Sequence, residues 1–167
     1  MIEYVINENI ALADTDAVVN AANGQGYMGG KRCINEMHCG VAENIQYFSR
    51  GKIEILAKAE CRERGGFLGF RPGTVFCTEA PFLNTRHIIH AVTMRFPGSK
   101  AHMETIEMLV PEILRVTGFL SIDSVAVPML GCGTGGLPQT EVLKIFERFF
   151  KNSQKQFLIY IKDKEMF

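Results

Sequence analysis

The sequence predicts an α/β fold in which helices cover both faces of a mixed β-sheet. Three observations lead to this class. Short apolar runs, typical of buried strands, alternate with segments whose apolar residues recur at helical spacing. No internal repeat or linker interrupts this order. Two of the runs are each followed by a glycine-rich loop, and in such sheets ligands bind beyond the carboxyl ends of the strands. We therefore expect the two loops to face each other across one cleft.

Length, charge and cysteine usage narrow the class of protein further. We expect residues 1–167 to form a single domain that is long enough to bury a core. Lys plus Arg and Asp plus Glu balance at 18 each, which argues against a broad basic surface but is compatible with a local patch. No apolar run is long enough to span a membrane, and the acidic N-terminus does not resemble a signal peptide. The five scattered cysteines favour a reducing, cytoplasmic location.

The order of the predicted elements follows from apolar spacing and from glycine and proline positions. The predicted strands are 2–6, 17–20, 74–78, 86–93, 124–128 and 157–161. One helix is expected from Ile34 to Phe48, where apolar residues recur at three- and four-residue steps. The other predicted helices are 53–64, 103–116 with a kink at Pro111, and one that has Pro138 in its first turn and runs to about Lys151.

Each glycine-rich loop has two interpretations. The first, with Gly24, Gly26, Gly29 and Gly30, follows the strand that ends on Asn20 to Asn23. Such a loop delivers backbone N–H groups without side chains in the way, as at a pyrophosphate, but it is equally compatible with a surface turn. The second, Gly131 to Gly136, is neither a Walker A loop nor a Rossmann fingerprint. It precedes Pro138 and a helix, which suits an anion at backbone amides or a tight structural turn.

These residues carry a resemblance to a known family. The segment Asp16-Ala-Val-Val-Asn-Ala-Ala-Asn23 resembles the signature of the macrodomain family, as does Asn9-Ile10 before it. The segments 71–75 and 86–93 are similar to the family's middle strands, and the second loop lies where macrodomains have their second phosphate loop. The resemblance covers nearly the whole chain in the right order. It implies a three-layer α/β/α sandwich that binds ADP-ribose.

The resemblance also implies roles for individual residues. Asn9 and Ile10 would lie near the adenine, Asn23 would bind the distal ribose, and Asn20 and Ala21 would shape the floor. The expected partners are ADP-ribose itself or an ADP-ribosylated protein, nucleic acid or small molecule, and no membrane. Neither a cofactor nor a metal is expected. Tyr160 is the candidate aromatic for stacking on the adenine. Backbone amides beside the ribose and around the diphosphate would come from Gly29, Gly30, Gly131, Cys132, Gly133, Thr134 and Gly135.

The sequence departs from the family at positions that bear on catalysis. Position 9 is Asn where the family usually has Asp, and the run 29–34 lacks the carboxylate of many hydrolytic members, Glu36 being the nearest. The second loop resembles the branch that removes ADP-ribose from glutamate or DNA bases. That branch uses an Asp or a Lys, but Gly135 stands at the Asp position and Met37 near the Lys.

The remaining catalytic candidates have an ordinary structural alternative. Lys31 is the proposed catalytic residue, as nucleophile or phosphate clamp, but a lysine beside such a loop is often only a solvated charge. Cys33 is a weaker nucleophile candidate, because a cysteine is more often buried and inert. A zinc site built on Cys33, His38 and Cys39 is disfavoured by their spacing. His90 is expected to be a hydrogen-bonded strand histidine.

Two functions therefore remain open. The first is an ADP-ribosyl hydrolase, or an ADP-ribose-1″-phosphate phosphatase, with an unusual catalytic set. The second is a module that reads or sequesters an ADP-ribose derivative without cleaving it, and the missing carboxylate favours this alternative.

Overall fold

Six strands form one mixed sheet in the computed structural model, which describes residues 1–162. Their order in the sheet is β1-β6-β5-β2-β4-β3, with β3 and β4 antiparallel and every other pair parallel. This confirms the predicted α/β class. The bounds are β1 Ile2–Ile6, β2 Ala17–Asn23, β3 Val75–Glu79, β4 His87–Met94, β5 Ser124–Pro128 and β6 Gln156–Ile161.

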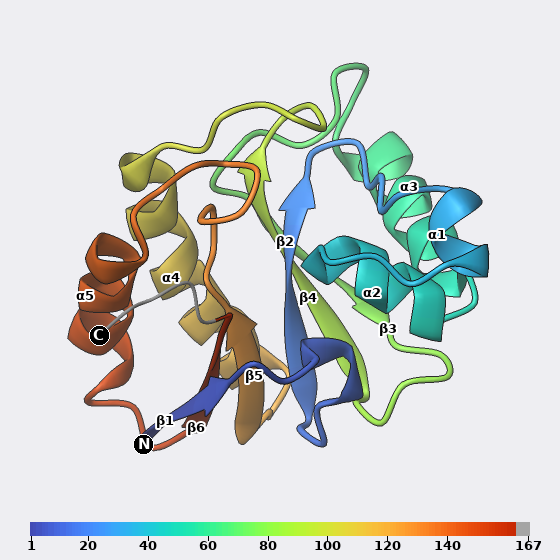
Figure 1. Cartoon of the computed structure of the whole chain (residues 1–167). Helices are drawn as coiled ribbons and strands as arrows, with labels where there is room; N and C mark the ends of the chain where they lie inside the picture. The colour runs from blue at the N-terminus through green and yellow to red at the C-terminus, as the bar shows by residue number, and fades with distance from the viewer. Residues whose placement is uncertain (163–167) are drawn as a thin grey trace.

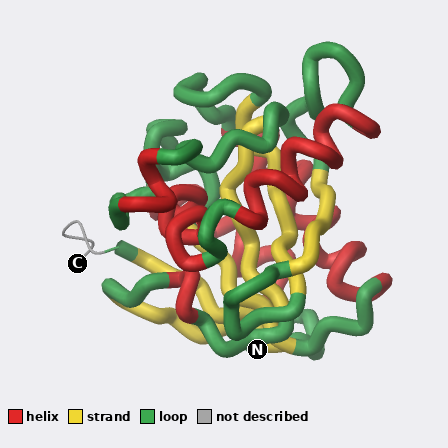
Figure 2. The backbone as a smooth tube through the Cα atoms, turned by 90° about the vertical axis from the view of Figure 1, so that its right-hand side faces the viewer, coloured by secondary structure: helices red, strands yellow, loops and turns green. Residues whose placement is uncertain are grey.

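Helices cover both faces of the sheet, as predicted (Figure 1). On one face lie α4 (Met103–Phe119) and α5 (Gln139–Phe150). On the other face lie the single-turn η1 (Ile10–Leu12), α1 (Arg32–Asn35), α2 (Val41–Phe48) and α3 (Lys52–Arg64). Figure 2, turned by 90°, shows this second helical layer in front of the strands. The three-layer α/β/α sandwich is thus confirmed.

Two hydrophobic clusters hold the layers together. Side chains alternate across β2, so Ala17 and Val19 pack toward α4 and α5 whereas Val18 and Ala22 pack toward η1 and α3. All four are buried. Because β2 is covered on both faces, its first three residues, Ala17 to Val19, are all apolar, as is typical of a central strand in a largely parallel sheet.

The helix predicted from Ile34 to Phe48 is two helices, which corrects that prediction. The chain leaves α1 at Glu36, whose backbone is extended, and re-enters a helix only after Gly40. The carbonyl groups of His38 and Gly40 accept hydrogen bonds from Asn44 Nδ2 at 2.7 and 2.8 Å. The Asn44 side chain therefore stabilises the break by pairing the His38 carbonyl, whereas the Gly40 carbonyl also accepts a helical hydrogen bond from Asn44 N at 2.9 Å.

Other boundaries differ less. Strand β2 continues three residues beyond Asn20, to Asn23. Pro111 lies inside α4, which ends at Phe119, and Pro138 is the N-cap of α5 and not a first-turn residue. No helix among residues 1–162 is long and apolar enough to cross a membrane.

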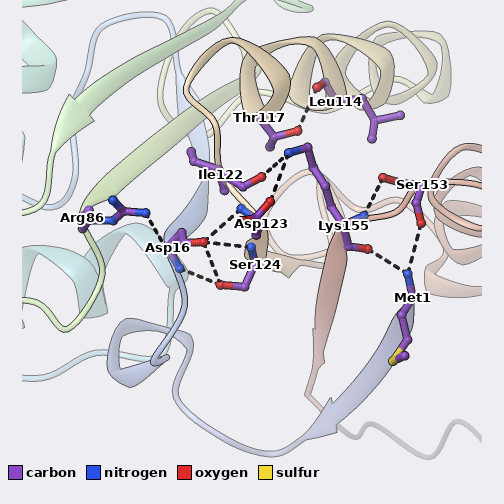
Figure 3. A network of polar contacts seen from close by, with 10 residues as sticks. All are labelled: Met1, Asp16, Arg86, Leu114, Thr117, Ile122, Asp123, Ser124, Ser153 and Lys155. Atoms are coloured by element: carbon purple, nitrogen blue, oxygen red, sulfur yellow. Dashed lines mark hydrogen bonds and ion pairs between the residues drawn. The ribbon is translucent and has the colours of Figure 1, made fainter.

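Asp16 fixes the amino end of β2, far along the strand from its glycine loop. Its Oδ2 accepts from the backbone N–H groups of Asp123 and Ser124 at 3.0 and 3.1 Å, and its Oδ1 pairs with Arg86 at 2.6 Å (Figure 3). These partners lower the pKa of Asp16 to about 2, the hydrogen bond from Asp123 being the largest cause. The first residue of the family-like segment therefore ties β2 to the starts of β4 and β5.

Candidate functional site

A cleft with a volume of about 890 Å³ opens at the carboxyl ends of β2, β4, β5 and β6. Both glycine loops line it, as predicted from their positions after parallel strands. The structure does not bring Asn20, Gly30 or Lys31 to the cleft wall. The other predicted binding residues all line it: Asn9, Ile10, Ala21, Asn23, Gly29, Gly131, Cys132, Gly133, Thr134, Gly135 and Tyr160.

Asn23 organises the first loop with its own side chain. Its Oδ1 accepts from the N–H groups of Gln25 and Tyr27 at 3.1 and 3.2 Å, and its Nδ2 donates to the Tyr27 carbonyl at 2.8 Å. A carboxamide has two N–H donors, so one remains for a ligand hydroxyl. The side chain faces the cleft and can therefore shape the loop and donate to a ligand at once.

The first loop also contains an internal anion, which the sequence analysis missed. The carboxylate of Glu54, a buried residue of α3, accepts from the N–H groups of Met28 and Gly30 at 2.6 and 2.9 Å. Lys58 Nζ lies 2.7 Å from the same carboxylate. The Gly30 amide expected beside a ligand diphosphate is therefore occupied by the protein's own carboxylate.

The second loop leaves its central amides open. Leu137 N and Gly136 N donate to the carbonyl groups of Gly131 and Gly133, at 2.9 and 3.1 Å, which closes the turn. Within residues 1–162, the N–H groups of the three intervening residues, 133–135, have no hydrogen-bond partner. Unpaired amides on consecutive residues form an anion-binding concavity. This arrangement can hold a phosphate group without a charged side chain.

Close packing explains why this loop is rich in glycine. Gly131 has a φ of +74°, and a Cβ on Gly135 would lie 2.6 Å from both Ala101 Cβ and Gly131 O. A Cβ on Gly133, by contrast, would meet no atom within 4 Å. Glycine is thus required by packing at Gly135 and by conformation at Gly131.

Asn9, Ile10 and Tyr160 lie together at one end of the cleft. Asn9 Oδ1 caps η1 by accepting from Ala11 N at 3.0 Å, and its Nδ2 donates to Asn44 Oδ1 at 3.0 Å. The Tyr160 ring is half-buried at the end of β6. Burial, and then the nearby Glu8 carboxylate, raises the pKa of the Tyr160 hydroxyl. This end of the cleft offers the aromatic ring of Tyr160 and the polar side chain of Asn9 to a nucleobase.

Asn20 lies in the core and not in the cleft wall. Its Nδ2 is 3.2 Å from His90 Nδ1, while His90 Nε2 is 3.0 Å from the Thr78 hydroxyl. Burial lowers the pKa of His90 to about 3, so the ring is neutral at physiological pH. The predicted role of His90 as a hydrogen-bonded strand histidine agrees with these contacts. Asn20 supports the sheet below the cleft.

The predicted nucleophiles are poorly placed. Lys31 is exposed and does not line the cleft, and Cys33 is completely buried beside Gly29. Cys132 does line the cleft, but burial raises the pKa of its thiol to about 12, so the thiolate is absent at neutral pH. No group of three or more His, Cys, Asp or Glu side chains within the described chain is arranged to hold a metal ion.

Two charged residues of the cleft escaped the sequence analysis. Glu43, on the first turn of α2, and Arg32, on α1, both line the cleft and lie 3.6 Å apart. A Cβ on Gly29 would lie 3.4 Å from Glu43 Cγ, so the methylene stem of Glu43 lies against the first loop, while one carboxylate oxygen, Oε1, pairs with Arg32. Glu43 is three residues after Gly40 and accepts from its N–H at 3.2 Å. That glycine-to-glutamate spacing signals a helix start and would have located it.

Comparisons with known proteins agree with this geometry. The sequence profile of the Macro domain family matches residues 19–146. An uncharacterized protein of Aquifex aeolicus is 30% identical over 135 residues, which is 81% of this chain and 72% of that protein. A DNA ADP-ribosyl glycohydrolase of Mycobacterium bovis is 30% identical over 78% of this chain. The chain spans about a third (33%) of the length of that enzyme.

Solved structures show the same fold. The macrodomain of Mycobacterium tuberculosis DarG superposes with a TM-score of 0.77 at 25% identity, covering 96% of this chain and 97% of that one. Thermosipho africanus DarTG in complex with ADP-ribose superposes with a TM-score of 0.74 at 17% identity, covering 99% of this chain and 43% of that one. The family profile covers most of the sequence and the fold and cleft match it, so this chain belongs to the Macro domain family.

Proposed function

We propose that this protein binds an ADP-ribosyl group in the cleft, with the diphosphate on the second glycine loop. The observation that carries the proposal is the run of unpaired amides at residues 133–135 in the cleft wall. Among residues 1–162, the ionic side chains that line the cleft are two carboxylates, Glu8 and Glu43, and two cations, Arg32 and Lys162. Because these charges balance, an anionic ligand must be held mainly by backbone N–H groups.

With the diphosphate on the second loop, the two ends of the ligand are placed by the residues on either side. The adenine lies at the end formed by Ile10 and Tyr160, and the distal ribose lies between Asn23 and Gly29. The free N–H of Asn23 then faces the ribose hydroxyls. The DarTG structure that superposes on this chain is a complex with ADP-ribose, which supports the choice of ligand.

Hydrolysis of an ADP-ribosyl linkage is a second candidate, and Glu43 is the observation that favours it. Its side chain lines the cleft and its Cγ packs beside Gly29, where the distal ribose is placed. In this reaction a water oxygen attacks the anomeric carbon while Glu43 takes the water proton. The bond from that carbon to the attached group breaks, and the leaving group takes up a proton. The relatives named DNA ADP-ribosyl glycohydrolases support this candidate.

Calorimetry with ADP-ribose tests the binding proposal. We expect saturable heat with ADP-ribose and weaker binding of AMP, which lacks the second phosphate and the distal ribose. No heat with ADP-ribose at any concentration would overturn the proposal.

Release of ADP-ribose from a modified oligonucleotide or protein then tests hydrolysis. We expect release by the native protein, and Glu43→Gln should abolish release while ADP-ribose still binds. The exposed Glu36→Gln is the matched control, since Glu36 does not line the cleft. Binding without release by the native protein would leave a reader of ADP-ribosyl groups.

A further inference from the structure

A second, smaller groove adjoins the cleft and has a volume of about 370 Å³. It shares Tyr27 and Pro97 with the cleft, so the two hollows are continuous at the surface. We propose that this groove, defined by Gln25, Tyr27, Lys58, Arg62 and Phe67, binds the single-stranded nucleic acid that carries the ADP-ribosyl group. This inference rests on the proposed function and adds the class of substrate.

Charge is the first argument. The groove is lined by two cations, Lys58 and Arg62, and by no carboxylate within the described residues. Lys58 already pairs with the buried carboxylate of Glu54 at 2.7 Å, and Glu60 pairs with Arg64 at 2.9 Å. Arg62 is therefore the groove cation that has no carboxylate partner among the described residues. A nucleic-acid strand supplies the phosphates that such a groove requires. The patch is local, which is compatible with a chain whose formal net charge is zero.

An aromatic platform is the second argument. The side chain of Phe67 is fully exposed, with a relative accessibility of 101%. An exposed ring beside a cation can stack on an unpaired base. Basic grooves that bear exposed aromatic rings are the usual design of single-strand binding sites. A groove of this size accepts a nucleotide or two and is too small for a duplex.

The platform is held in place by the cleft itself. The loop that carries Phe67 follows α3 and projects past the carboxyl edge of β2, at the top of Figure 1. Phe70 N donates to the Gly24 carbonyl at 3.0 Å, and Gln25 Nε2 donates to the Leu68 carbonyl at 2.8 Å. The Phe67 loop is therefore bonded directly to the first glycine loop, so a strand stacked on Phe67 is held at a fixed position beside the cleft.

Lys58 connects the two sites. Its Nζ lies 5.4 Å from the centroid of the Tyr27 ring, and Tyr27 belongs to both the groove and the cleft. A phosphate at Lys58 is thus next to the position of the distal ribose, where a nucleobase linked to the anomeric carbon would leave the cleft. The strand continues from there over Arg62 to Phe67.

Fluorescence anisotropy with a labelled single-stranded DNA oligonucleotide, unmodified or ADP-ribosylated, tests this inference. We expect Phe67→Ala and Arg62→Ala each to weaken binding of the strand about tenfold, with binding of free ADP-ribose by calorimetry unchanged. The matched controls are Phe119→Ala, an exposed ring at the end of α4, and Arg115→Ala on the same helix. The slope of log affinity against log salt should fall by about 0.7 in Arg62→Ala and remain unchanged in Arg115→Ala.

The outcomes separate this inference from the proposed function. If the native protein binds ADP-ribose but Phe67→Ala and Phe119→Ala bind the strand equally well, the groove inference is overturned and the cleft proposal stands. If Phe67→Ala weakens binding of an ADP-ribosylated peptide as much as that of the strand, the groove recognises polypeptide and the inference is also overturned. If ADP-ribose does not bind the native protein, the proposed function fails, whatever the groove variants do.

Discussion

The two glycine loops share a composition but use their amides in opposite ways. In the first loop, the carboxylate of Glu54 and the side chain of Asn23 accept hydrogen bonds from four backbone N–H groups. In the second loop, the amides of residues 133–135 are unpaired within the described chain. Both loops line the same cleft. A glycine-rich loop is therefore not by itself a phosphate site, because an internal anion can already occupy its amides.

This difference assigns different tasks to the two walls of the cleft. The first loop is fixed before any ligand arrives and presents a shaped wall with a spare side-chain donor on Asn23 and the N–H of Gly29, which is unpaired within residues 1–162. The second loop supplies the donors that a diphosphate needs, and its backbone is already ordered by the contacts of Gly131 and Gly135. A site whose donors are already in position loses less conformational entropy when the ligand binds.

The largest expected effect comes from removing the internal anion of the first loop. Glu54→Ala leaves the amides of Met28 and Gly30 and the ammonium of Lys58 without their partner. We expect the free energy of unfolding to fall by about 2–4 kcal/mol, because buried groups left unpaired are costly. Denaturant unfolding monitored by circular dichroism measures this loss in the free energy of unfolding.

The control for this variant is Glu60→Ala, on the same helix. Glu60 pairs with the exposed Arg64, and surface pairs contribute at most about 1 kcal/mol. Equal losses in the two variants would show that Glu54 does not hold the first loop, and the contrast between the loops would lose its physical basis.

Substitution by alanine distinguishes a glycine of the second loop that is required by packing, Gly135, from one that is not, Gly133. Gly135→Ala places a Cβ 2.6 Å from Ala101 Cβ, and we expect a loss of about 1–3 kcal/mol in the free energy of unfolding. In Gly133→Ala the added Cβ meets no atom within 4 Å, so stability should change by no more than about 0.5 kcal/mol. Thermal unfolding of both variants checks this pair. Equal stability would mean that the loop is not fixed by packing at Gly135.

Asn23 tests the side-chain donor that the first loop offers to a ligand. Asn23→Ala should weaken binding of ADP-ribose by about 0.5–1.5 kcal/mol, the usual contribution of a hydrogen bond between uncharged groups. Asn23→Asp keeps the acceptor for Gln25 and Tyr27 but removes the donor. Because Asn23→Asp also loses the hydrogen bond from Nδ2 to the Tyr27 carbonyl, calorimetry on both variants is paired with thermal unfolding, which shows whether the loop itself is weakened. Unchanged affinity in Asn23→Asp would argue against a ribose contact.

The sequence predicted the second loop better than the first. The amides of residues 133–135 belong to a continuous glycine motif, so a local pattern identifies them. Glu54 lies 24 and 26 residues from the amides that it binds, and only the packing of α3 against Gly26 brings it there. A Cβ on Gly26 would lie 2.7 Å from the backbone of Ala57, so this glycine permits the contact. Nothing local in the sequence shows which helix will approach.

The break between α1 and α2 is the feature that made the prediction of one helix from Ile34 to Phe48 wrong. The apolar spacing from Ile34 to Phe48 is compatible with one helix, and periodicity alone does not detect a short extended segment within it. The Asn44 side chain bonds the His38 carbonyl within this segment, and the apolar spacing does not show that contact. The sheet was easier to predict, because its buried strands are continuous apolar runs whose order along the chain limits the topology.

The smallest expected effect lies at the opposite end of β2 and shows whether effects at the loops are local. The pKa of Asp16 is lowered to about 2 in the folded protein, below the ordinary value of 3.8. The charged carboxylate therefore contributes stability that is present above about pH 4 and is lost as the pH falls toward about 2. We expect Asp16→Asn to reduce the free energy of unfolding at pH 7 by at most about 1 kcal/mol, since the side chain is partly exposed.

Unfolding measured between pH 2 and pH 7 checks this Asp16 prediction. The native protein should lose the Asp16 contribution on acidification, whereas Asp16→Asn should not, so the stabilities of the two proteins should converge near pH 2. Affinity for ADP-ribose at pH 7 should be equal in the two, because Asp16 contacts the starts of the strands and not the cleft. A weaker affinity in Asp16→Asn would mean that changes in strand β2 reach the loops through the sheet. The effects expected for Glu54 and Asn23 would then no longer identify the first loop as the source.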